Sequence, residues 1–226
     1  MISTIRHDSI FDKNTFNTPV HIIGAGATGS RVFAALVELG LTNITVHDFD
    51  DIEPHNLANQ AYQHDDIGMP KVMGCARLYQ DKTGENVPTG MELLNERVTG
   101  DTKLSGVVFL LTDTMSSRKE IFEGALLNNI DVEFLIETRM ASSYGNVYAI
   151  DPCNEAQSAK WLETLSEDDD PSETSACGAS ISVGPTASII ANMAVWQFIN
   201  FAENREAVDE ETVVFLRPLV ISAGKI

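Results

Sequence analysis

The feature that most constrains the fold is a glycine-rich turn between an apolar run and an amphipathic segment. Residues 20–23 form a short apolar run that ends at the glycines, as a buried strand does. Residues 24–29 read G-x-G-x-x-G, and residues 30–39 carry apolar side chains on one helical face. Strand, glycine turn and helix in this order are typical of the first βαβ unit of a nucleotide-binding sheet.

Strands and helices continue to alternate along the chain, which predicts an α/β fold: a doubly wound, Rossmann-like, mainly parallel sheet with helices on both faces. We expect the last strand at 213–219, with only a short tail after it. One domain is expected over 1–226, with an N-terminal segment 1–17, a nucleotide-binding half 18–140, and a second half 141–226 that contains an acidic crossover loop at 166–176. The further strands are expected at 44–47, 107–111, 132–136 and 144–150, and the helices at 71–80, 116–127, 157–165 and 185–202.

Charge and composition narrow the classes of partner. The formal net charge is −18, whereas nucleic-acid binding needs a basic footprint, so no nucleic-acid partner is expected. The acidic excess either serves solubility or selects a partner with a basic or apolar docking face. No apolar run is long enough for a membrane span and the N-terminus is too polar for a secretory signal. Three widely spaced cysteines predict no disulfide framework and a cytoplasmic location.

The glycine turn predicts a phosphate site. Gly24, Gly26 and Gly29 allow a tight turn and a close backbone approach, and the helix that follows offers free N–H groups, beginning near Thr28. Asp48 comes 19 residues after Gly29, at the end of the second strand, where a carboxylate can accept the hydroxyls of a ribose. The alternative is a purely structural glycine turn. The motif does not say which nucleotide would bind.

A polar block directly after Asp48 separates the classes of nucleotide-binding protein, because a dehydrogenase has no use for it there. The block resembles the ubiquitin-activating superfamily, which includes the ThiF, MoeB and HesA proteins, and which reads roughly D-x-D-x-V-x-x-x-N-L-x-R-Q and then D-x-G-x-x-K. The resemblance implies that nucleotide-binding residues lie in this block and that ATP is the nucleotide. The matching residues are Asp48, Asp50, Asn56, Leu57, Gln60, Gly68 and Lys71.

A second match to the same family follows the strand at 107–111. Asp113 ends that strand and Arg118 lies about a turn later, and the resemblance implies that Asp113 binds Mg²⁺ and that Arg118 contacts the nucleotide. Carboxylate oxygens suit Mg²⁺, and the carboxyl ends of parallel strands meet at the ligand crevice. The alternative for Asp113 is a helix N-cap, although Ser116 can also cap. The alternative for Arg118 is a surface position.

The third match is Cys177, which lies before the helix at 185–202. The resemblance implies either an acyl-accepting nucleophile or a small residue without chemistry, and acidic neighbours should raise its pKa. The chain also departs from the family pattern. Asn59 stands where the family has an arginine before Gln60, and Arg6, Arg31 or Arg139 are the candidates to replace it.

Other departures concern zinc and length. Many relatives carry two C-x-x-C pairs, but Cys153 has no partner at that spacing, so no zinc is expected. The resemblance covers about residues 18–200. It also implies a homodimer or a pairing with a related subunit, in which Arg6 is the only candidate to reach the neighbouring nucleotide.

Three functions are compatible with these patterns. In the first, Lys71 and Asp113 serve an ATP- and Mg²⁺-dependent adenylyltransferase, which activates the C-terminal carboxylate of a small carrier protein or peptide. In the second, the same fold binds a nucleotide and acts as a scaffold without chemistry. In the third, the chain is an NAD-dependent oxidoreductase, which leaves Asn56, Gln60 and Lys71 without a role.

Overall fold

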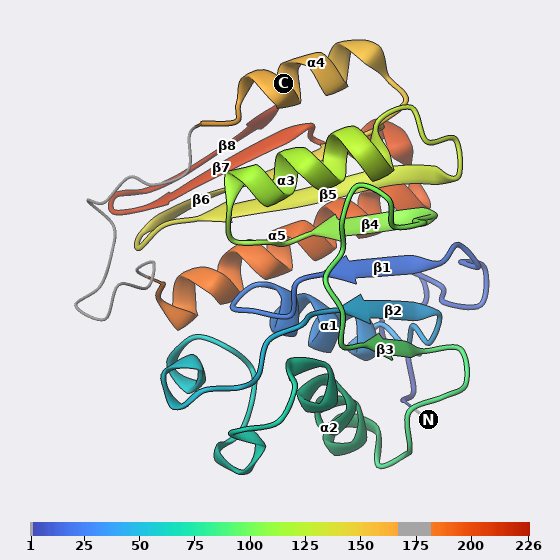
Figure 1. The fold of residues 1–226 in the computed structure, drawn as a ribbon. Coiled ribbons are helices and arrows are strands. Elements are labelled where there is room, and N and C mark those ends of the chain that lie inside the picture. The colour runs from blue at the N-terminus through green and yellow to red at the C-terminus, as the bar shows by residue number, and fades with distance from the viewer. Residues whose placement is uncertain (1, 167–181) are drawn as a thin grey trace.

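The fold is built on one eight-stranded sheet with the strand order β3-β2-β1-β4-β5-β6-β7-β8 (Figure 1). The computed structural model describes residues 2–166 and 182–226. Cys177 and nearly all of the acidic crossover loop therefore lie outside the described residues.

The first five strands of this order are parallel, as the sequence predicts. Parallel neighbours need crossover connections, and the helices α1 (Gly29–Glu38), α2 (Lys71–Thr83) and α3 (Met115–Ile121) provide them. All five residues of the central strand β4 are buried, as expected for a sheet that is covered on both faces. The parallel strands are β1 (Val20–Ile23), β2 (Ile44–His47), β3 (Glu92–Leu94), β4 (Gly106–Leu110) and β5 (Val132–Met140).

The remaining three strands are antiparallel: β6 (Tyr144–Ile150), β7 (Glu211–Leu216) and β8 (Leu219–Gly224). The expected short tail after the last strand is wrong. The chain reverses at Arg217 and Pro218, and a further strand pairs with β7. Five of the six residues of β8 are exposed, so the strand lacks the buried apolar run by which the other strands were predicted.

Helices cover both faces of the sheet, which confirms the predicted fold class (Figure 1). On one face, α1, α2 and α5 (Gly184–Glu203) share a core in which Phe198 contacts the rings of Phe11 and Phe109. On the other face, α3 and α4 (Glu155–Glu163) enclose a second core around Phe122 and Trp161. None of the helices in the described ranges is long and apolar enough to cross a membrane.

Two other elements differ from the expectation. The three-residue edge strand β3 was not predicted, because it is too short to show a period. The helix expected at 116–127 is α3 followed by a π-helical turn, η3 (Phe122–Leu126). In that turn Gly124 packs directly against Gly100, and a Cβ on Gly124 would lie 2.4 Å from the Gly100 Cα.

Candidate functional site

The glycine turn lies between the end of β1 and the start of α1, and its three glycines have different reasons to be there. Gly24 has φ +94°, and a Cβ there would lie 2.7 Å from the carbonyl oxygen of Leu111. A Cβ on Gly29 would lie 1.9 Å from the carbonyl oxygen of Gly24. A Cβ on Gly26 would meet no atom within 4 Å. Gly26 therefore faces open space beside the first turn of α1, where a phosphate could approach.

Asp48 is fixed against this turn. Its Oδ2 accepts a hydrogen bond of 2.6 Å from the N–H of Ala25, and its Oδ1 accepts one of 2.8 Å from the N–H of Asp50. Burial raises the pKa of Asp48, while the charge of Lys71 and the two N–H donors act in the opposite direction. A carboxylate offers about four lone-pair sites, so Asp48 can still accept ligand hydroxyls, and its role toward a ribose stays a prediction.

Lys71 completes an ion cluster with two of the predicted site residues. Its Nζ lies 2.6 Å from Asp50 Oδ2 and 3.8 Å from Asp48 Oδ1, and its own N–H donates to the carbonyl oxygen of Asp50. Lys71 and Asp48 are both buried, whereas Asp50 is half-exposed. The structure thus brings these three residues together, with the lysine charge already matched by two carboxylates.

Asn56 and Gln60 lie in the polar block after β2, at and just beyond the short 3₁₀ helix η1 (Pro54–Ala58). Asn56 Oδ1 accepts a 2.8 Å hydrogen bond from the N–H of Glu53, so part of its amide shapes the block itself. Gln60 Oε1 and Asn59 Oδ1 are buried without a hydrogen-bond partner among the described residues. Leaving such atoms unpaired costs about 1–3 kcal/mol each, which favours a polar ligand beside the block.

Asp113 follows β4 and is exposed at the start of the α3 segment. The alternative role of Asp113 as the helix cap is wrong, and so is the suggestion that Ser116 caps. Thr114 is the N-cap, and its Oγ1 accepts a 3.3 Å bond from the N–H of Ser117. Beside Asp113, Thr112 Oγ1 is buried without a partner in the described part of the chain. Asp113 is therefore available to a ligand, and Thr112 is a second polar group at the same place.

A cavity of about 230 Å³ connects the ends of β1, β2 and β4. It contains Gly24, Asp48 and Asp113 from the sequence prediction, but not Lys71, Asn56 or Gln60. Other lining residues were not predicted, because no motif marks them. The guanidinium of one of these, Arg97, lies 5.4 Å over the ring of another, Phe49. The cavity is lined by Ile23, Gly24, His47, Asp48, Phe49, Glu96, Arg97, Val98, Thr112, Asp113, Thr114, Ser117 and Ile121.

His47 lines this cavity, and His21 lies behind it. His47 Nε2 is 3.2 Å from His21 Nδ1, and His47 Nδ1 is 3.3 Å from Glu96 Oε1. Burial lowers the pKa of His47 despite Glu96, and burial together with His47 lowers the pKa of His21 to about 4. Both pKa values lie below 6.5, so both rings are mainly neutral at pH 7. The Glu96 carboxylate therefore faces the cavity without a charged histidine beside it.

Arg118 lies beside the glycine turn but is bound by a buried carboxylate. Its Nε is 2.9 Å from Glu137 Oε1, and the other oxygen of Glu137 is 2.9 Å from Arg139 Nε. Arg118 Nη2 donates to the carbonyl oxygen of Thr138, whose Oγ1 donates to Thr28 Oγ1 at 3.4 Å. Two guanidinium groups thus contact the same buried carboxylate. Contact of Arg118 with a nucleotide stays a prediction.

The side chains of the site offer few ligands to a metal ion. Within residues 2–166 and 182–226, no group of three or more His, Cys, Asp or Glu side chains could hold one. Mg²⁺ in nucleotide sites is bound by one or two carboxylates, with phosphates and water as the other ligands. The exposed carboxylate of Asp113 beside the cavity fits that pattern.

Solved structures with a similar fold cover nearly the whole chain. A structure of PaaA superposes with a TM-score of 0.72 at 17% identity and covers 97% of this chain and 67% of that one. A structure of Escherichia coli MccB with ATP superposes with a TM-score of 0.70 at 14% identity, and it covers 94% of this chain and 65% of that one. A structure of MccB with AMPCPP and MccA superposes with a TM-score of 0.69 at 15% identity, and it covers 96% of this chain and 66% of that one. These likenesses show the shared fold.

Curated relatives match about half of the chain. The ubiquitin-like modifier-activating enzyme ATG7 of Saccharomyces cerevisiae is 32% identical over 142 residues, covering 55% of this chain and 22% of that protein. The adenylyltransferase and sulfurtransferase MOCS3 of Caenorhabditis briggsae is 31% identical over 121 residues, covering 52% and 30%. The chain thus spans less than a third of the length of either. Residues 4–219 match the ThiF family. This match covers nearly the whole chain, which therefore belongs to that family.

Proposed function

We propose that this chain is an ATP-dependent adenylyltransferase that activates a carboxylate. The observation that carries the proposal is the arrangement of Asp48, Lys71 and Asp113 around the glycine turn and its cavity. The names of the relatives support it, since one is a modifier-activating enzyme and another an adenylyltransferase. MccB, which shares the fold, has been solved with ATP and with MccA.

The proposed reaction asks little covalent chemistry of the protein. A carboxylate oxygen of the acceptor forms a bond to the α-phosphorus of ATP, and the bond from that phosphorus to the bridging oxygen of the β-phosphate breaks. Pyrophosphate leaves with the electron pair, and an acyl-adenylate remains. No proton has to be transferred, so the rate depends on positioning and on charge neutralisation.

Each site residue is proposed to contact a different part of ATP. The glycine turn places phosphates at the start of α1, and Asp48 holds the ribose while the cavity takes the base. Asn56 and Lys71 orient the phosphates. Asp113 would hold Mg²⁺, which neutralises phosphate charge when bound.

The acceptor is proposed to be the C-terminal carboxylate of a small carrier protein or peptide. The ends of β5 to β8 project past α3 and α4 on the side where α3 begins (Figure 1). There the exposed rings of Tyr144 and Phe215 stack at 5.8 Å, and Val220 is the register partner of Phe215. We propose that apolar residues preceding the acceptor's C-terminus lie on this surface. Replacing Tyr144 and Phe215 by alanine should raise the KM for the acceptor and leave ATP binding unchanged, and an unaltered KM would contradict the assignment.

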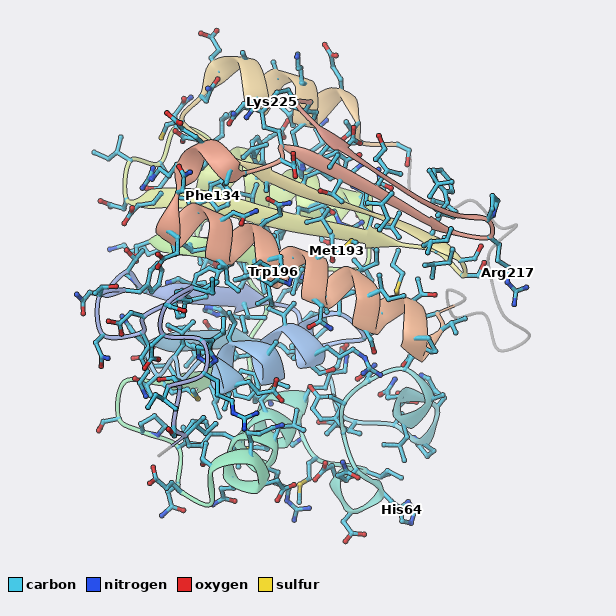
Figure 2. The ribbon with its side chains drawn as sticks, turned by 180° about the vertical axis from the view of Figure 1, so that it is seen from behind. His64, Phe134, Met193, Trp196, Arg217 and Lys225 are labelled. Atoms are coloured by element: carbon cyan, nitrogen blue, oxygen red, sulfur yellow. The ribbon has the colours of Figure 1, made fainter. Side chains whose placement is uncertain are left out.

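A homodimer is proposed through α5. Met193 and Trp196 lie along the outer side of this helix (Figure 2), and Trp196 is 55% exposed. The helix carries no charged residue before Glu203. In a chain of net charge −18, an uncharged face is where two copies repel each other least. Light scattering should therefore give twice the monomer mass, and Trp196→Glu should give the monomer. A wild-type monomer at micromolar concentration would rule out this interface.

A second function has its own support. Asn59 replaces the arginine of the family pattern, and Asp48 and Asp50 already engage Lys71. These observations favour a nucleotide-binding scaffold without adenylation. The scaffold predicts saturable ATP binding without ATP–pyrophosphate exchange.

Calorimetric titration with Mg-ATP, and separately with NAD⁺, tests the proposal. We expect Mg-ATP to bind and NAD⁺ not to bind. Asp113→Ala should lower the affinity for Mg-ATP. The matched control is Asp131→Ala, an exposed aspartate just before β5, at the amino ends of the parallel strands and so opposite Asp113. Pyrophosphate exchange with candidate carriers then separates the enzyme from the scaffold. Preference for NAD⁺ would refute both.

A further inference from the structure

The candidate site contains more carboxylates than cations for a triphosphate. Lys71 is matched by Asp48 and Asp50, and Asp113 adds another negative charge. A bound metal ion offsets part of this charge, but the arginine that the family pattern places before Gln60 is Asn59 here. The phosphates therefore need a cation from another position in the chain.

Two of the three arginines considered from the sequence are excluded by their positions. Arg6 is exposed, and its neighbour His7 lines a cavity with Glu38 and Leu39, at the end of α1 opposite the glycine turn. Arg139 is held by Glu137 and by two hydrogen bonds of 2.7 and 2.9 Å to Thr164. Its ring contacts, with Tyr148 at 4.5 Å and Trp161 at 5.7 Å, hold it further in the core on the α4 side of the sheet.

Arg31 lies directly beside Asn59. It is the third residue of α1, and its Nε donates a 3.3 Å hydrogen bond to the carbonyl oxygen of Asn59. Its Nη2 is 3.4 Å from where a Cβ on Gly184 would be, so the guanidinium lies between the polar block and the start of α5. Among the described residues, no carboxylate is within ion-pair distance of Arg31, and its Nη atoms make no hydrogen bond. Its cationic end is therefore available to a ligand.

The surroundings hold Arg31 close to the glycine turn. The preceding residue, Ser30, donates through its Oγ to the carbonyl oxygen of Gly26 at 2.8 Å and accepts from the N–H of Ala61 at 3.0 Å. These two bonds fix the polar block to the first turn of α1, where phosphates bind in folds of this kind. Burial lowers the pKa of Arg31, but an arginine side chain stays protonated in proteins.

We propose that Arg31 supplies the phosphate-binding cation that Asn59 does not, from the neighbouring position on α1. This inference rests on the proposed function, because it requires ATP at the glycine turn. It deepens that function by assigning a catalytic role to a residue outside the family motifs. A guanidinium at position 31 suits this role because its planar fork binds phosphate oxygens in pairs.

The test compares two nucleotides in wild type and two variants. Calorimetry of Mg-ATP and of AMP is run on wild type, Arg31→Gln and Arg31→Gln/Asn59→Arg, with melting temperatures as the folding check. The matched control is Arg205→Gln. Arg205 pairs with Glu133 on the surface beyond the far end of α5, roughly 30 Å from its first turn.

We expect Arg31→Gln to lower the affinity for Mg-ATP by roughly 10- to 100-fold, as for the loss of one charge-assisted hydrogen-bond pair. The affinity for AMP should fall by less than about threefold, that is by under about 0.7 kcal/mol. Adding Asn59→Arg should restore most of the Mg-ATP affinity. Unchanged Mg-ATP affinity in Arg31→Gln, or an equal loss for both nucleotides, would overturn the inference, and so would a folded double variant without recovery. If the double variant does not fold, the contrast between ATP and AMP in Arg31→Gln decides. If wild type binds neither nucleotide, the proposed function falls as well.

Discussion

Replacing Lys71 by alanine is the sharpest test of the ion cluster, because it separates a structural role from a functional one. The change removes an ammonium that lies 2.6 Å from Asp50 Oδ2 and 3.8 Å from Asp48 Oδ1. Asp48 keeps its two backbone donors, and Asp50 is half-exposed and can be solvated. The structural damage should therefore be moderate.

The geometry sets the size of that damage. Two unit charges 3.8 Å apart attract each other by about 4 kcal/mol at an effective dielectric constant of about 20, before desolvation is subtracted. Breaking a fully buried pair costs about 3–5 kcal/mol, but Asp48 remains hydrogen-bonded. We expect the free energy of unfolding to fall by about 1–3 kcal/mol. Typical domains have about 5–15 kcal/mol, so Lys71→Ala stays folded.

The loss should depend on pH with a definite sign. Burial already raises the pKa of Asp48 above its ordinary value of 3.8, and removing Lys71 raises it further. The folded state then binds a proton more readily than the unfolded state does. The stability lost in Lys71→Ala is therefore small below pH 3.8 and grows as the pH rises through the raised pKa.

The rate of adenylation should fall by much more than the loss of stability can explain. Loss of one charge-stabilising group lowers the rate by roughly 10²-fold or more. Pyrophosphate exchange measures this loss, and urea unfolding at two pH values measures the stability. The matched control is Lys82→Ala, since Lys82 lies on the same helix in a surface pair with Glu38. Unchanged exchange in folded Lys71→Ala would refute a role for the lysine in the reaction.

Three further predictions follow from local geometry. Gly26→Ala should change the free energy of unfolding by no more than about 0.5 kcal/mol, because its Cβ enters open space. It should lower the affinity for Mg-ATP by roughly tenfold or more, because a phosphate would occupy that space. Gly29→Ala should lower the free energy of unfolding by about 3 kcal/mol or more, because its Cβ overlaps the backbone. Calorimetry and thermal melting separate the two, and equal behaviour would contradict the assignment. His21 has a folded pKa of about 4 against 6.5 unfolded, so its contribution to stability is lost as the pH falls from 6.5 toward 4. His21→Leu should flatten the measured slope, and parallel curves would count against this. Glu137→Gln should lower the free energy of unfolding in urea by about 3–5 kcal/mol, because it removes the buried carboxylate with which both Arg118 and Arg139 pair. A loss under about 1 kcal/mol would contradict this.

The parallel half of the fold could be predicted because its strands are buried on both faces. Residues 107–111 are a continuous apolar run, and residues 20–23 are apolar except for His21. Such runs need no knowledge of their neighbours to be recognised. The edge strands β3 and β8 lack that signal. One is only three residues long and the other is mostly exposed, so their pairing depends on contacts with β2 and β7 rather than on burial.

The candidate site shows the same division. Gly24, Asp48 and Asp113 could be predicted because each lies at the end of a strand, and the parallel topology brings strand ends together. Arg118 illustrates what could not be predicted. Its buried partner Glu137 comes from a strand 19 residues later in the chain, and nothing in the local sequence indicates that this carboxylate points toward α3.

Charge balance connects these observations. A chain of net charge −18 repels a nucleotide, so binding requires a positive field confined to the phosphate end of the site. The N–H groups at the start of α1 and the guanidinium of Arg31 lie at that end. The cavity that would take the base has the Arg97 guanidinium in its wall together with the carboxylates of Glu96 and Asp48, so it presents no net positive charge to a ligand. If ATP binds as proposed, the chain therefore gains affinity with each phosphate and little from the base, and it should bind ATP, ADP and AMP in that order.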